Sequence, residues 1–215
     1  MPTVLITGAN AGAGLSLART YARRGWAVLA ANPRPFTAAD FATLGPDVSE
    51  LRYDPGSDSS ARDLALRLTG RTIDHAIFTH VLREETATPI DHVTGAVFER
   101  AMMKNTFAPL SLAALLAPNL ASAAKPVAVA LIDPAGRTGR FHGPAQYGLR
   151  ASQAALAQMW RTLAVEWRDS GIHCLALHGA GDPDALAAAV LREIDAPDRR
   201  SSGDIVDLDL AATPA

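Results

Sequence analysis

Short apolar runs alternate along the chain with stretches in which apolar residues recur every three or four positions. A continuous apolar run such as residues 126–132 (PVAVALI) predicts a strand that is covered on both faces of a sheet. The helical spacing predicts amphipathic helices between the strands. The predicted strands are residues 4–6, 26–31, 50–53, 73–79, 126–132, 172–177 and, at the edge of the sheet, 204–208. The predicted helices are residues 15–21, 38–44, 61–68, 94–120 with a kink near Pro109, 146–169 and 184–194.

This alternation predicts an α/β fold with a doubly wound parallel sheet and helices on both faces, because parallel neighbouring strands need helical crossovers. No internal repeat, linker or low-complexity tract interrupts the pattern. A chain of 215 residues is long enough for a substantial core. We therefore expect a single Rossmann-type domain over residues 1–215.

The composition narrows the class of protein. Hydrophobic residues make up 48% of the chain and charged residues 20%, which suits a buried sheet and argues against disorder. The formal net charge of −2 predicts no affinity for nucleic acids or anionic membranes. Neither a signal peptide nor an apolar run of membrane-spanning length is found, so we expect a soluble, cytoplasmic protein. The single cysteine, Cys174, lies in an apolar run and is expected to be a buried thiol; no disulfide and no metal site is predicted.

The glycine-rich stretch at residues 7–14 (TGANAGAG) stands between the first predicted strand and helix. The order of strand, tight turn and helix N-terminus is typical of a site for a dinucleotide pyrophosphate, because the first N–H groups of a helix lack partners and its dipole favours an anion. Gly8 would allow the sharp turn, Gly12 would let the backbone approach the phosphates, and Gly14 would let the helix pack against the strand. The alternative is a turn that binds no ligand.

These glycines also carry a resemblance to a known family. Thr7, Gly8, Gly12 and Gly14 match the pattern Thr-Gly-x-x-x-Gly-x-Gly, and the segment resembles the short-chain dehydrogenase/reductase family, with Ala13 where the family usually has isoleucine. The resemblance extends over nearly the whole chain and is closest to the shorter, cytoplasmic branch. It implies a Rossmann fold, a nicotinamide cofactor, and oxidoreduction of a carbonyl or alcohol on a small-molecule substrate.

Residues after the second, third and fourth strands are candidates for the cofactor, because ligands of such sheets lie outside the carboxyl ends of the strands. No acid follows the second strand, where Asn32 and Arg34 stand; Arg34 could pair with a 2′-phosphate, which favours NADP over NAD, or it is a solvated loop charge. Asp54 matches an aspartate that the family places near the adenine, or it forms an Asx-turn before Pro55. The predicted cofactor-binding residues are Thr7, Gly8, Asn10, Gly12, Ala13, Gly14, Arg34, Asp54 and Thr79.

The segment after the fourth strand departs from the family. The family usually has Asn-Asn-Ala-Gly here, whereas this chain has Thr79, His80, Val81 and Leu82, and the bulky side chains could crowd a backbone approach. His80 is either an acid/base group or a polar residue with a structural partner. Asn105 matches the family's asparagine on the long helix, which the resemblance associates with an active-site water and a backbone bend.

The residues of the family's chemistry are absent. Its hydride transfer needs a tyrosine for the proton, a lysine four residues later and a serine that polarises the carbonyl. The family pattern Tyr-x-x-Ser-Lys-Ala-Ala-Leu aligns with residues 149–156 (LRASQAAL), so Leu149 occupies the tyrosine position and Gln153 the lysine position. Asp133 falls at the serine position, where its charge would repel a developing alkoxide. The standard mechanism therefore cannot run on these residues.

Substitute groups are conceivable, and the catalytic candidates are Asn105, Asp133 and Tyr147, with His80 and His142 as further proton carriers. Tyr147 lies two residues before Leu149, roughly 200° around a helix, so it reaches the site only if the helix starts after it. Otherwise it packs or contacts a second subunit. Asp133 is either a base in an apolar setting or part of an Asp-Pro turn.

Three functions follow from this pattern. The first is an oxidoreductase with non-standard catalytic groups, the second is a catalytically silent protein that binds a dinucleotide or a partner subunit, and the third is a non-redox enzyme on the same scaffold. Residues 177–183 run almost directly into the next helix, so the family's substrate lid is predicted to be missing or very short.

The two long helices, residues 94–120 and 146–169, match those that form the family's four-helix dimer interface. We therefore expect a dimer or tetramer, with identical copies or with a related active subunit. Trp160 and Trp167 lie seven residues apart on one side of the second helix, where they belong to the core or anchor a contact.

Overall fold

The computed structural model describes residues 1–83, 89–139, 144–196 and 200–211. Seven parallel strands form one sheet in the order β3-β2-β1-β4-β5-β6-β7. The strands are β1 (Thr3–Thr7), β2 (Ala27–Asn32), β3 (Val48–Arg52), β4 (His75–Phe78), β5 (Val127–Ile132), β6 (His173–His178) and β7 (Ile205–Asp207). The chain moves outward from β1 to β3 and then returns to place β4 on the other side of β1. This is the doubly wound parallel sheet that the alternation predicted.

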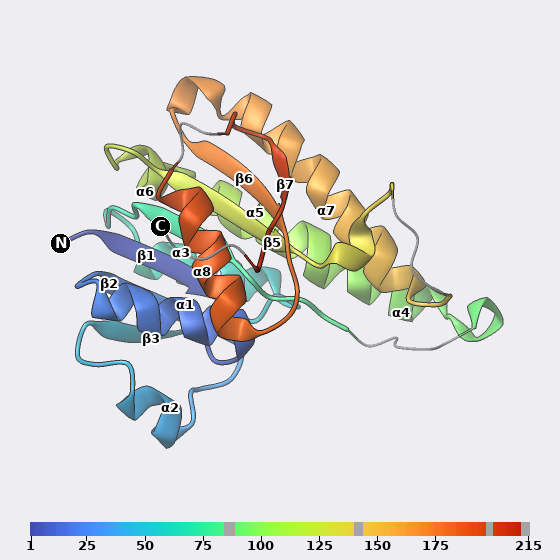
Figure 1. Ribbon diagram of the computed structural model, residues 1–215, viewed down its shortest axis with the longest axis horizontal. Coiled ribbons are helices and arrows are strands. Elements are labelled where there is room, and N and C mark those ends of the chain that lie inside the picture. Colours follow the sequence, from blue (N-terminus) through green and yellow to red (C-terminus); the bar gives the residue numbers. More distant parts are fainter. Residues whose placement is uncertain (84–88, 140–143, 197–199, 212–215) are drawn as a thin grey trace.

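Helices cover both faces of the sheet (Figure 1). The α-helices are α1 (Gly12–Arg23), α2 (Ala38–Ala42), α3 (Asp58–Arg67), α4 (Gly95–Met102), α5 (Ala108–Leu115), α6 (Ala117–Ala121), α7 (Tyr147–Glu166) and α8 (Pro183–Ile194). Short 3₁₀ turns are η1 (Ile90–His92), η3 (Pro134–Gly136) and η4 (Arg168–Ser170), and η2 (Met103–Phe107) is a π-helical turn. Helices α1 and α8 pack on one face, whereas α3, α5, α6 and α7 pack on the other.

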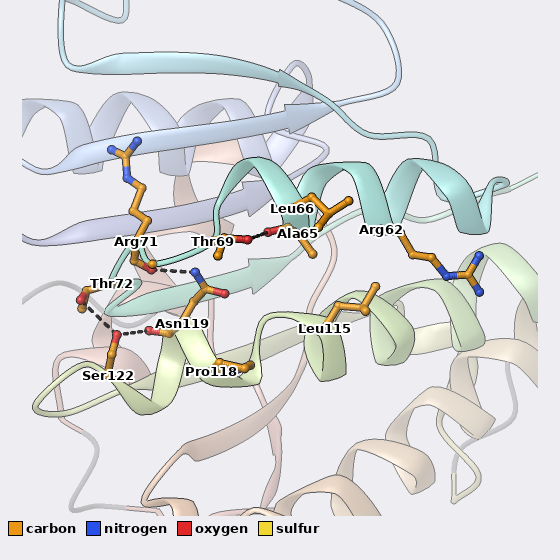
Figure 2. Close-up of a pocket in the computed structure, with 11 residues that line it drawn as sticks. Arg62, Ala65, Leu66, Thr69, Arg71, Thr72, Leu115, Pro118, Asn119 and Ser122 are labelled. Atoms are coloured by element: carbon orange, nitrogen blue, oxygen red, sulfur yellow. Dashed lines mark hydrogen bonds between the residues drawn. The ribbon is translucent and has the colours of Figure 1, made fainter.

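The long helical region predicted over residues 94–120 is present, but it is not one regular α-helix. A π-helical turn separates α4 from α5, and a second break falls at Leu116. The π-helical turn ends two residues before Pro109, which has no N–H for the carbonyl of Asn105 four residues earlier, so the irregularity lies close to the predicted kink. The second break has its cause in Pro118, which cannot donate to the carbonyl four residues earlier. Asn119 then ties α6 to the turn after α3, since its Nδ2 donates to the carbonyl of Leu68 and to that of Arg71, the second of which Figure 2 shows.

Several strand boundaries also differ from their predictions. Strand β3 runs from Val48 to Arg52 and so begins two residues earlier than predicted. The prediction missed its start because the exposed polar residues Ser49 and Glu50 follow Val48 and interrupt the apolar pattern. Strand β4 is shorter than the predicted residues 73–79, and β7 is shorter than the predicted 204–208. The prediction that β7 lies at the edge is confirmed.

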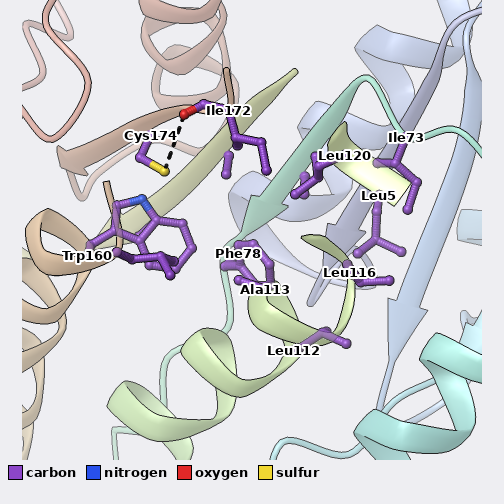
Figure 3. Close-up of a cluster of buried hydrophobic side chains, with 14 of the residues drawn as sticks. Leu5, Ile73, Phe78, Leu112, Ala113, Leu116, Leu120, Trp160, Ile172 and Cys174 are labelled. Atoms are coloured by element: carbon purple, nitrogen blue, oxygen red, sulfur yellow. Dashed lines mark hydrogen bonds between the residues drawn. The ribbon is translucent and has the colours of Figure 1, made fainter. Parts of the chain in front are cut away.

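The larger of two cores lies between the sheet and α3, α5, α6 and α7 (Figure 3). Trp160 is fully buried there and packs edge-on against Phe78, with ring centroids 5.3 Å apart. Trp167 is buried in the same core, so neither tryptophan is available to a partner. Cys174 is buried as predicted, and burial raises the pKa of its thiol to about 12. None of the helices in the described ranges is both long and apolar enough to cross a membrane.

Candidate functional site

The turn between β1 and α1 has the backbone conformation of a phosphate-binding loop. Gly8 and Gly12 have φ angles of +69° and +50°, a region that residues with a Cβ rarely adopt. The Gly8 N–H donates to the carbonyl of Ala31 at 2.9 Å, which holds the turn at the end of β2. The side-chain Nδ2 of Asn10 donates to the carbonyl of Arg34 at 3.0 Å. The turn is thereby joined to the loop after β2.

Gly14 brings α1 against the end of the sheet. A Cβ on Gly14 would lie 2.3 Å from the carbonyl oxygen of Gly8 and 2.8 Å from Thr79 Oγ1, so only glycine fits. Thr79 Oγ1 in turn donates to the Thr7 carbonyl at 2.7 Å, and the Thr79 N–H donates to Thr7 Oγ1 at 3.3 Å. These bonds fix the ends of β1 and β4 beside the helix.

The N-terminus of α1 is available to an anion. Ala11 precedes the helix and supplies no side-chain cap. The first N–H groups of α1, at Gly12, Ala13 and Gly14, have no acceptors within the helix, and the helix dipole places partial positive charge there. The chemistry of this turn therefore suits a phosphate group.

A cavity of about 520 Å³ opens beside the turn. Its volume lies in the range of sites for small molecules and cofactors. The cavity is lined by most of the predicted cofactor-binding residues, namely Gly8, Asn10, Gly12, Ala13, Gly14, Arg34 and Thr79. Residues 179–181 and Pro183 form the opposite wall, where Ser16 Oγ donates to Asp184 Oδ1 at 2.6 Å and holds α8 against α1.

Two predicted cofactor residues, Thr7 and Asp54, do not line the cavity. Thr7 points its hydroxyl at Thr79, as described above. Asp54 Oδ1 accepts from the Gly56 N–H at 2.9 Å, which is the Asx-turn that the sequence offered as the alternative.

Asn32, at the end of β2, is a buried residue with unused hydrogen-bonding capacity. Its side chain is 1% exposed, and neither Oδ1 nor Nδ2 has a partner in the described part of the chain. Buried polar atoms without partners are rare in folded proteins. Asn32 ends β2 next to Pro33 and Arg34, which line the cavity, but Asn32 itself does not line it.

The corner formed by β5, η3 and α7 holds the substituted catalytic positions. Leu149 is 5% exposed and Gln153 is fully buried. Gln153 Oε1 accepts from the Asp133 N–H at 2.7 Å, so the side chain at the lysine position supports the end of β5. A Cβ on Gly136 would lie 2.6 Å from Gln153 Cβ, which shows how closely η3 packs on α7.

Asp133 and Arg83 form an ion pair through Asp133 Oδ2 and Arg83 Nη2. The Asp133 carboxylate is 8% exposed, the guanidinium is 56% exposed, and both residues line the cavity. Asp133 Oδ1 also accepts from the Ala135 N–H at 2.8 Å. Both carboxylate oxygens are thus engaged, which weakens Asp133 as a general base.

Asn105 lies fully buried in the π-helical turn. Its Oδ1 accepts from the Leu82 N–H at 2.7 Å, and its Nδ2 donates to the Leu82 carbonyl at 3.1 Å and to Ser152 Oγ at 3.0 Å. Asn105 therefore ties the segment after β4 to α7. Both of its donor hydrogens are used inside the protein.

The remaining proton carriers are spread over different places. Tyr147 is the first residue of α7, is 39% exposed, and does not line the cavity. His142 lies outside the described residues. His80 does line the cavity, and burial, with a further contribution from Lys104, lowers the pKa of its imidazole below the usual value. Among the described residues no group of three or more histidine, cysteine, aspartate or glutamate side chains is placed to hold a metal ion.

A polar cluster beside β6 was not foreseen from the sequence. His178 Nδ1 lies 3.3 Å from Asp207 Oδ1, and Arg137 Nε lies 2.7 Å from the same oxygen. Burial lowers the pKa of the His178 imidazole below its usual value, against the opposing effect of Asp207. His178 and Asp207 end β6 and β7, Arg137 follows η3, and only the strand order brings the three residues together. Arg83, the partner of Asp133, was missed for the same reason.

Comparison with known proteins agrees with this architecture. A family model described as short chain dehydrogenase matches residues 2–181. A search of curated proteins found no match. A solved structure of a carbonyl reductase from Pseudomonas aeruginosa is 23% identical to this chain, with 96% of each chain covered and a TM-score of 0.83.

Two further solved structures are similar to this chain at low identity. An NADPH-bound carbonyl reductase from chicken fatty liver has a TM-score of 0.82 and 23% identity, with 96% of each chain covered. An NADH-dependent reductase, A1-R′, complexed with NAD has a TM-score of 0.85 and 21% identity, with 99% of this chain and 97% of that chain covered. At these identities the structures show a shared fold. Since the family model spans most of the residues, the chain belongs to the short-chain dehydrogenase/reductase family.

Proposed function

We propose that this chain binds a nicotinamide dinucleotide in the cavity beside the β1–α1 turn. The observation that carries the proposal is the approach of Gly14 to the Gly8 carbonyl, which leaves the uncapped N-terminus of α1 facing the cavity. The dinucleotide pyrophosphate would accept hydrogen bonds from the first N–H groups of α1.

The preferred cofactor in this proposal is NADP(H) rather than NAD(H). Arg34 lines the cavity and is exposed, and its guanidinium can pair with a 2′-phosphate. The residue at the end of β2 is Asn32, which lacks the negative charge that would repel that phosphate. Solved structures of similar fold carry either NADPH or NAD, so the preference rests on these two residues.

The second part of the proposal is that the family's hydride transfer is lost. The dinucleotide supplies or accepts the hydride when bound, and the protein must supply the proton and stabilise the alkoxide. Leu149 has no proton to give, and Gln153 is neutral and already bonded to the Asp133 backbone. Asp133, paired with Arg83, presents a carboxylate where the oxyanion would form. We therefore infer a catalytically silent dinucleotide-binding protein.

One observation favours a second candidate, an oxidoreductase that uses non-standard groups. His80 lines the cavity, and among the described residues its imidazole has no hydrogen-bond partner. Its lowered pKa keeps it neutral near pH 7, so it could relay a proton without carrying a charge. In this alternative a His80→Asn variant loses turnover while keeping the affinity for NADPH.

The exposed faces of α4, η2 and α7 support an oligomer as part of the proposal. They carry large apolar side chains in contact with solvent in this single chain: Phe98, Met103, Phe107, Met159 and Val165. Such a set is more apolar than a solvated helix surface needs to be. The proposed assembly joins these helices between two copies or with a related active subunit.

Only residues 179–182 separate β6 from α8, which supports a truncated substrate lid.

The test is a titration of the purified protein with NADPH and NADH, followed by calorimetry and nicotinamide fluorescence. We expect micromolar affinity for NADPH and weaker binding of NADH. Oxidation of NADPH is then measured with a panel of aldehydes and ketones, with His80→Asn beside the wild type.

Each outcome has a distinct meaning. Tight binding without turnover supports the silent protein. Binding with turnover that His80→Asn removes replaces it with the second candidate. No binding at millimolar concentrations of either cofactor overturns the proposal as a whole.

A further inference from the structure

The cavity at the carboxyl ends of the strands is built differently in its two halves. A doubly wound sheet offers one mononucleotide-binding half on each side of the point where the strand order reverses, and a dinucleotide lies across both. Here β1 to β3 form the first half and β4 to β6 the second. The first half contributes the glycine turn and Arg34 to the cavity. The strands of the second half that adjoin β1 are followed by larger side chains, namely His80, Val81, Arg83 and Asp133.

The ion pair of Arg83 and Asp133 joins the chain after β4 to the chain after β5. Both residues line the cavity, and in the strand order they stand between the glycine turn and residues 179–181 after β6. The Asp133 carboxylate is almost buried, so a ligand that displaced the guanidinium would leave its charge without that partner. A nucleoside in the second half must separate this pair, and the cost of doing so is subtracted from its binding free energy.

Helix α7 contributes nothing to the cavity. The structure describes all of its residues, Tyr147–Glu166, and none of them lines the cavity. The turn η3 packs against α7 so closely that a Cβ on Gly136 would lie 2.6 Å from Gln153 Cβ. Gln153 is fully buried and accepts from the Asp133 N–H. The second half therefore offers a ligand no group from the helix on which the family carries its tyrosine and lysine.

The first half is open by comparison. A Cβ on Gly12 would meet no atom within 4 Å, so there is space in front of the turn. The first N–H groups of α1 have no acceptors within the helix. Arg34 is exposed, and its guanidinium forms no ion pair with any residue that the structure describes. The donors for phosphate groups are thus accessible in this half.

We propose that the cavity holds the adenosine diphosphate part of a nucleotide and leaves the nicotinamide ring outside. This inference rests on the proposed function, because it uses the same turn and the same Arg34. The pyrophosphate lies at the start of α1 and the 2′-phosphate pairs with Arg34, whereas the pair of Arg83 and Asp133 closes the place of the ring. The ligand class is a nucleotide built on adenosine diphosphate, and a complete dinucleotide gains no affinity from its second base.

The test compares NADPH with 2′-phospho-ADP-ribose, which has a hydroxyl group in place of the nicotinamide ring, by calorimetry on the full chain. We expect the two dissociation constants to agree within about twofold, because the ring makes no contact that changes the binding free energy. Nicotinamide mononucleotide carries only the part of the dinucleotide that the cavity excludes. We expect no binding of it at about 1 mM.

Opening the ion pair should give the ring a place. The double variant Arg83→Ala/Asp133→Asn removes both charges, and the asparagine oxygen can still accept from the Ala135 N–H. We expect its NADPH affinity to rise at least about fivefold, while its affinity for 2′-phospho-ADP-ribose stays within about twofold of the wild type and shows that the variant is folded. The matched control is Arg24→Ala/Asp195→Asn, which breaks an ion pair of 3.0 Å outside the cavity. It should alter neither affinity.

Two results overturn this inference and leave the proposed function intact. One is a wild-type protein that binds NADPH at least about tenfold more tightly than 2′-phospho-ADP-ribose, because the ring then contributes to binding. The other is a double variant that binds 2′-phospho-ADP-ribose as the wild type does but gains no affinity for NADPH. Absence of binding by both ligands at millimolar concentration is a different outcome: it overturns the proposed function itself, and this inference with it.

Discussion

The β1–α1 turn and the corner formed by β5, η3 and α7 lie at the same edge of the sheet, but they depend on different parts of the chain. The turn is made of backbone: its glycines adopt positive φ angles and bring Gly14 within contact of Gly8. The corner is made of side chains, and there Leu149, Gln153 and Asp133 replace the family's three catalytic residues.

The contrast teaches that, in our proposal, the catalytic function can be lost while the turn keeps its geometry. The side chains of the corner make structural contacts: Gln153 accepts a hydrogen bond from the Asp133 N–H, and Asp133 forms an ion pair with Arg83. Neither contact disturbs the turn, because the turn needs nothing from those side chains. A dinucleotide site and a catalytic site at one sheet edge are therefore separable, and each can be perturbed alone.

The largest effect is expected at the turn. A Gly14→Ala variant places a methyl group 2.3 Å from the Gly8 carbonyl, so α1 must move away from the sheet. We expect NADPH affinity to fall about 1000-fold, or about 4 kcal/mol, measured by calorimetry at a temperature where the variant is folded.

The control for this variant is Gly95→Ala. Gly95 begins α4, and a Cβ there meets no atom within 4 Å. Its affinity for NADPH should equal that of the wild type. An unchanged affinity in Gly14→Ala would show that the turn does not carry the cofactor.

The next effect concerns the corner. Gln153→Lys restores the family's lysine but buries an ammonium group where the amide is fully enclosed. We expect a loss of about 3 kcal/mol in the free energy of unfolding, measured with urea, because the neighbouring Asp133 carboxylate already pairs with Arg83 and accepts from the Ala135 N–H.

Gln158→Lys is the matched control, since Gln158 is exposed on the same helix. It should change the stability by less than about 0.5 kcal/mol. If Gln153→Lys were as stable as this control, the corner would still accommodate the family's catalytic lysine, and the contrast drawn above would be lost.

A smaller effect distinguishes the two cofactors. Arg34→Ala removes the cation that we propose for the 2′-phosphate, and it leaves the turn intact. NADPH affinity should fall about tenfold while NADH affinity stays constant, which calorimetry with both cofactors measures. Arg23→Ala, at the far end of α1, is the control and should alter neither. Equal losses for the two cofactors would assign Arg34 to the shared phosphates.

The same contrast explains how far the sequence could be interpreted. Features carried by the backbone were predictable: the strand, turn and helix at residues 3–19, the parallel sheet, and the burial of Cys174. These depend on local periodicity and on glycines, which a sequence displays directly. The substitutions at Leu149 and Gln153 were also visible, because a resemblance aligns single positions.

Contacts between distant segments were not predictable. Arg83 and Asp133 are 50 positions apart, and only the neighbouring placement of β4 and β5 brings them together. The resemblance associated Asn105 with a backbone bend, and Asn105 lies in the π-helical turn, but its bonds to Leu82 and Ser152 join segments that local pattern does not connect. The start of α7 follows Ala145 and Gln146, which have positive φ angles without being glycines. Local pattern contains no signal for such features.

The smallest effect is a pH dependence of the polar cluster beside β6, the next strand after the corner. Burial lowers the folded-state pKa of His178 below the unfolded value, while Asp207 opposes the shift and keeps it modest. The unfolded chain then binds more protons than the folded one below about pH 6.5, so this residue's contribution to stability is present above that pH. It is lost as the pH falls toward the folded-state pKa.

His178→Asn should therefore flatten the decline of unfolding free energy between pH 7 and pH 5, measured with urea at each pH. His92→Asn, at an exposed site, should leave the decline unchanged. A decline that His178→Asn does not alter would mean that the polar cluster beside β6 binds no proton in this range, and that it is as insensitive to pH as the backbone turn.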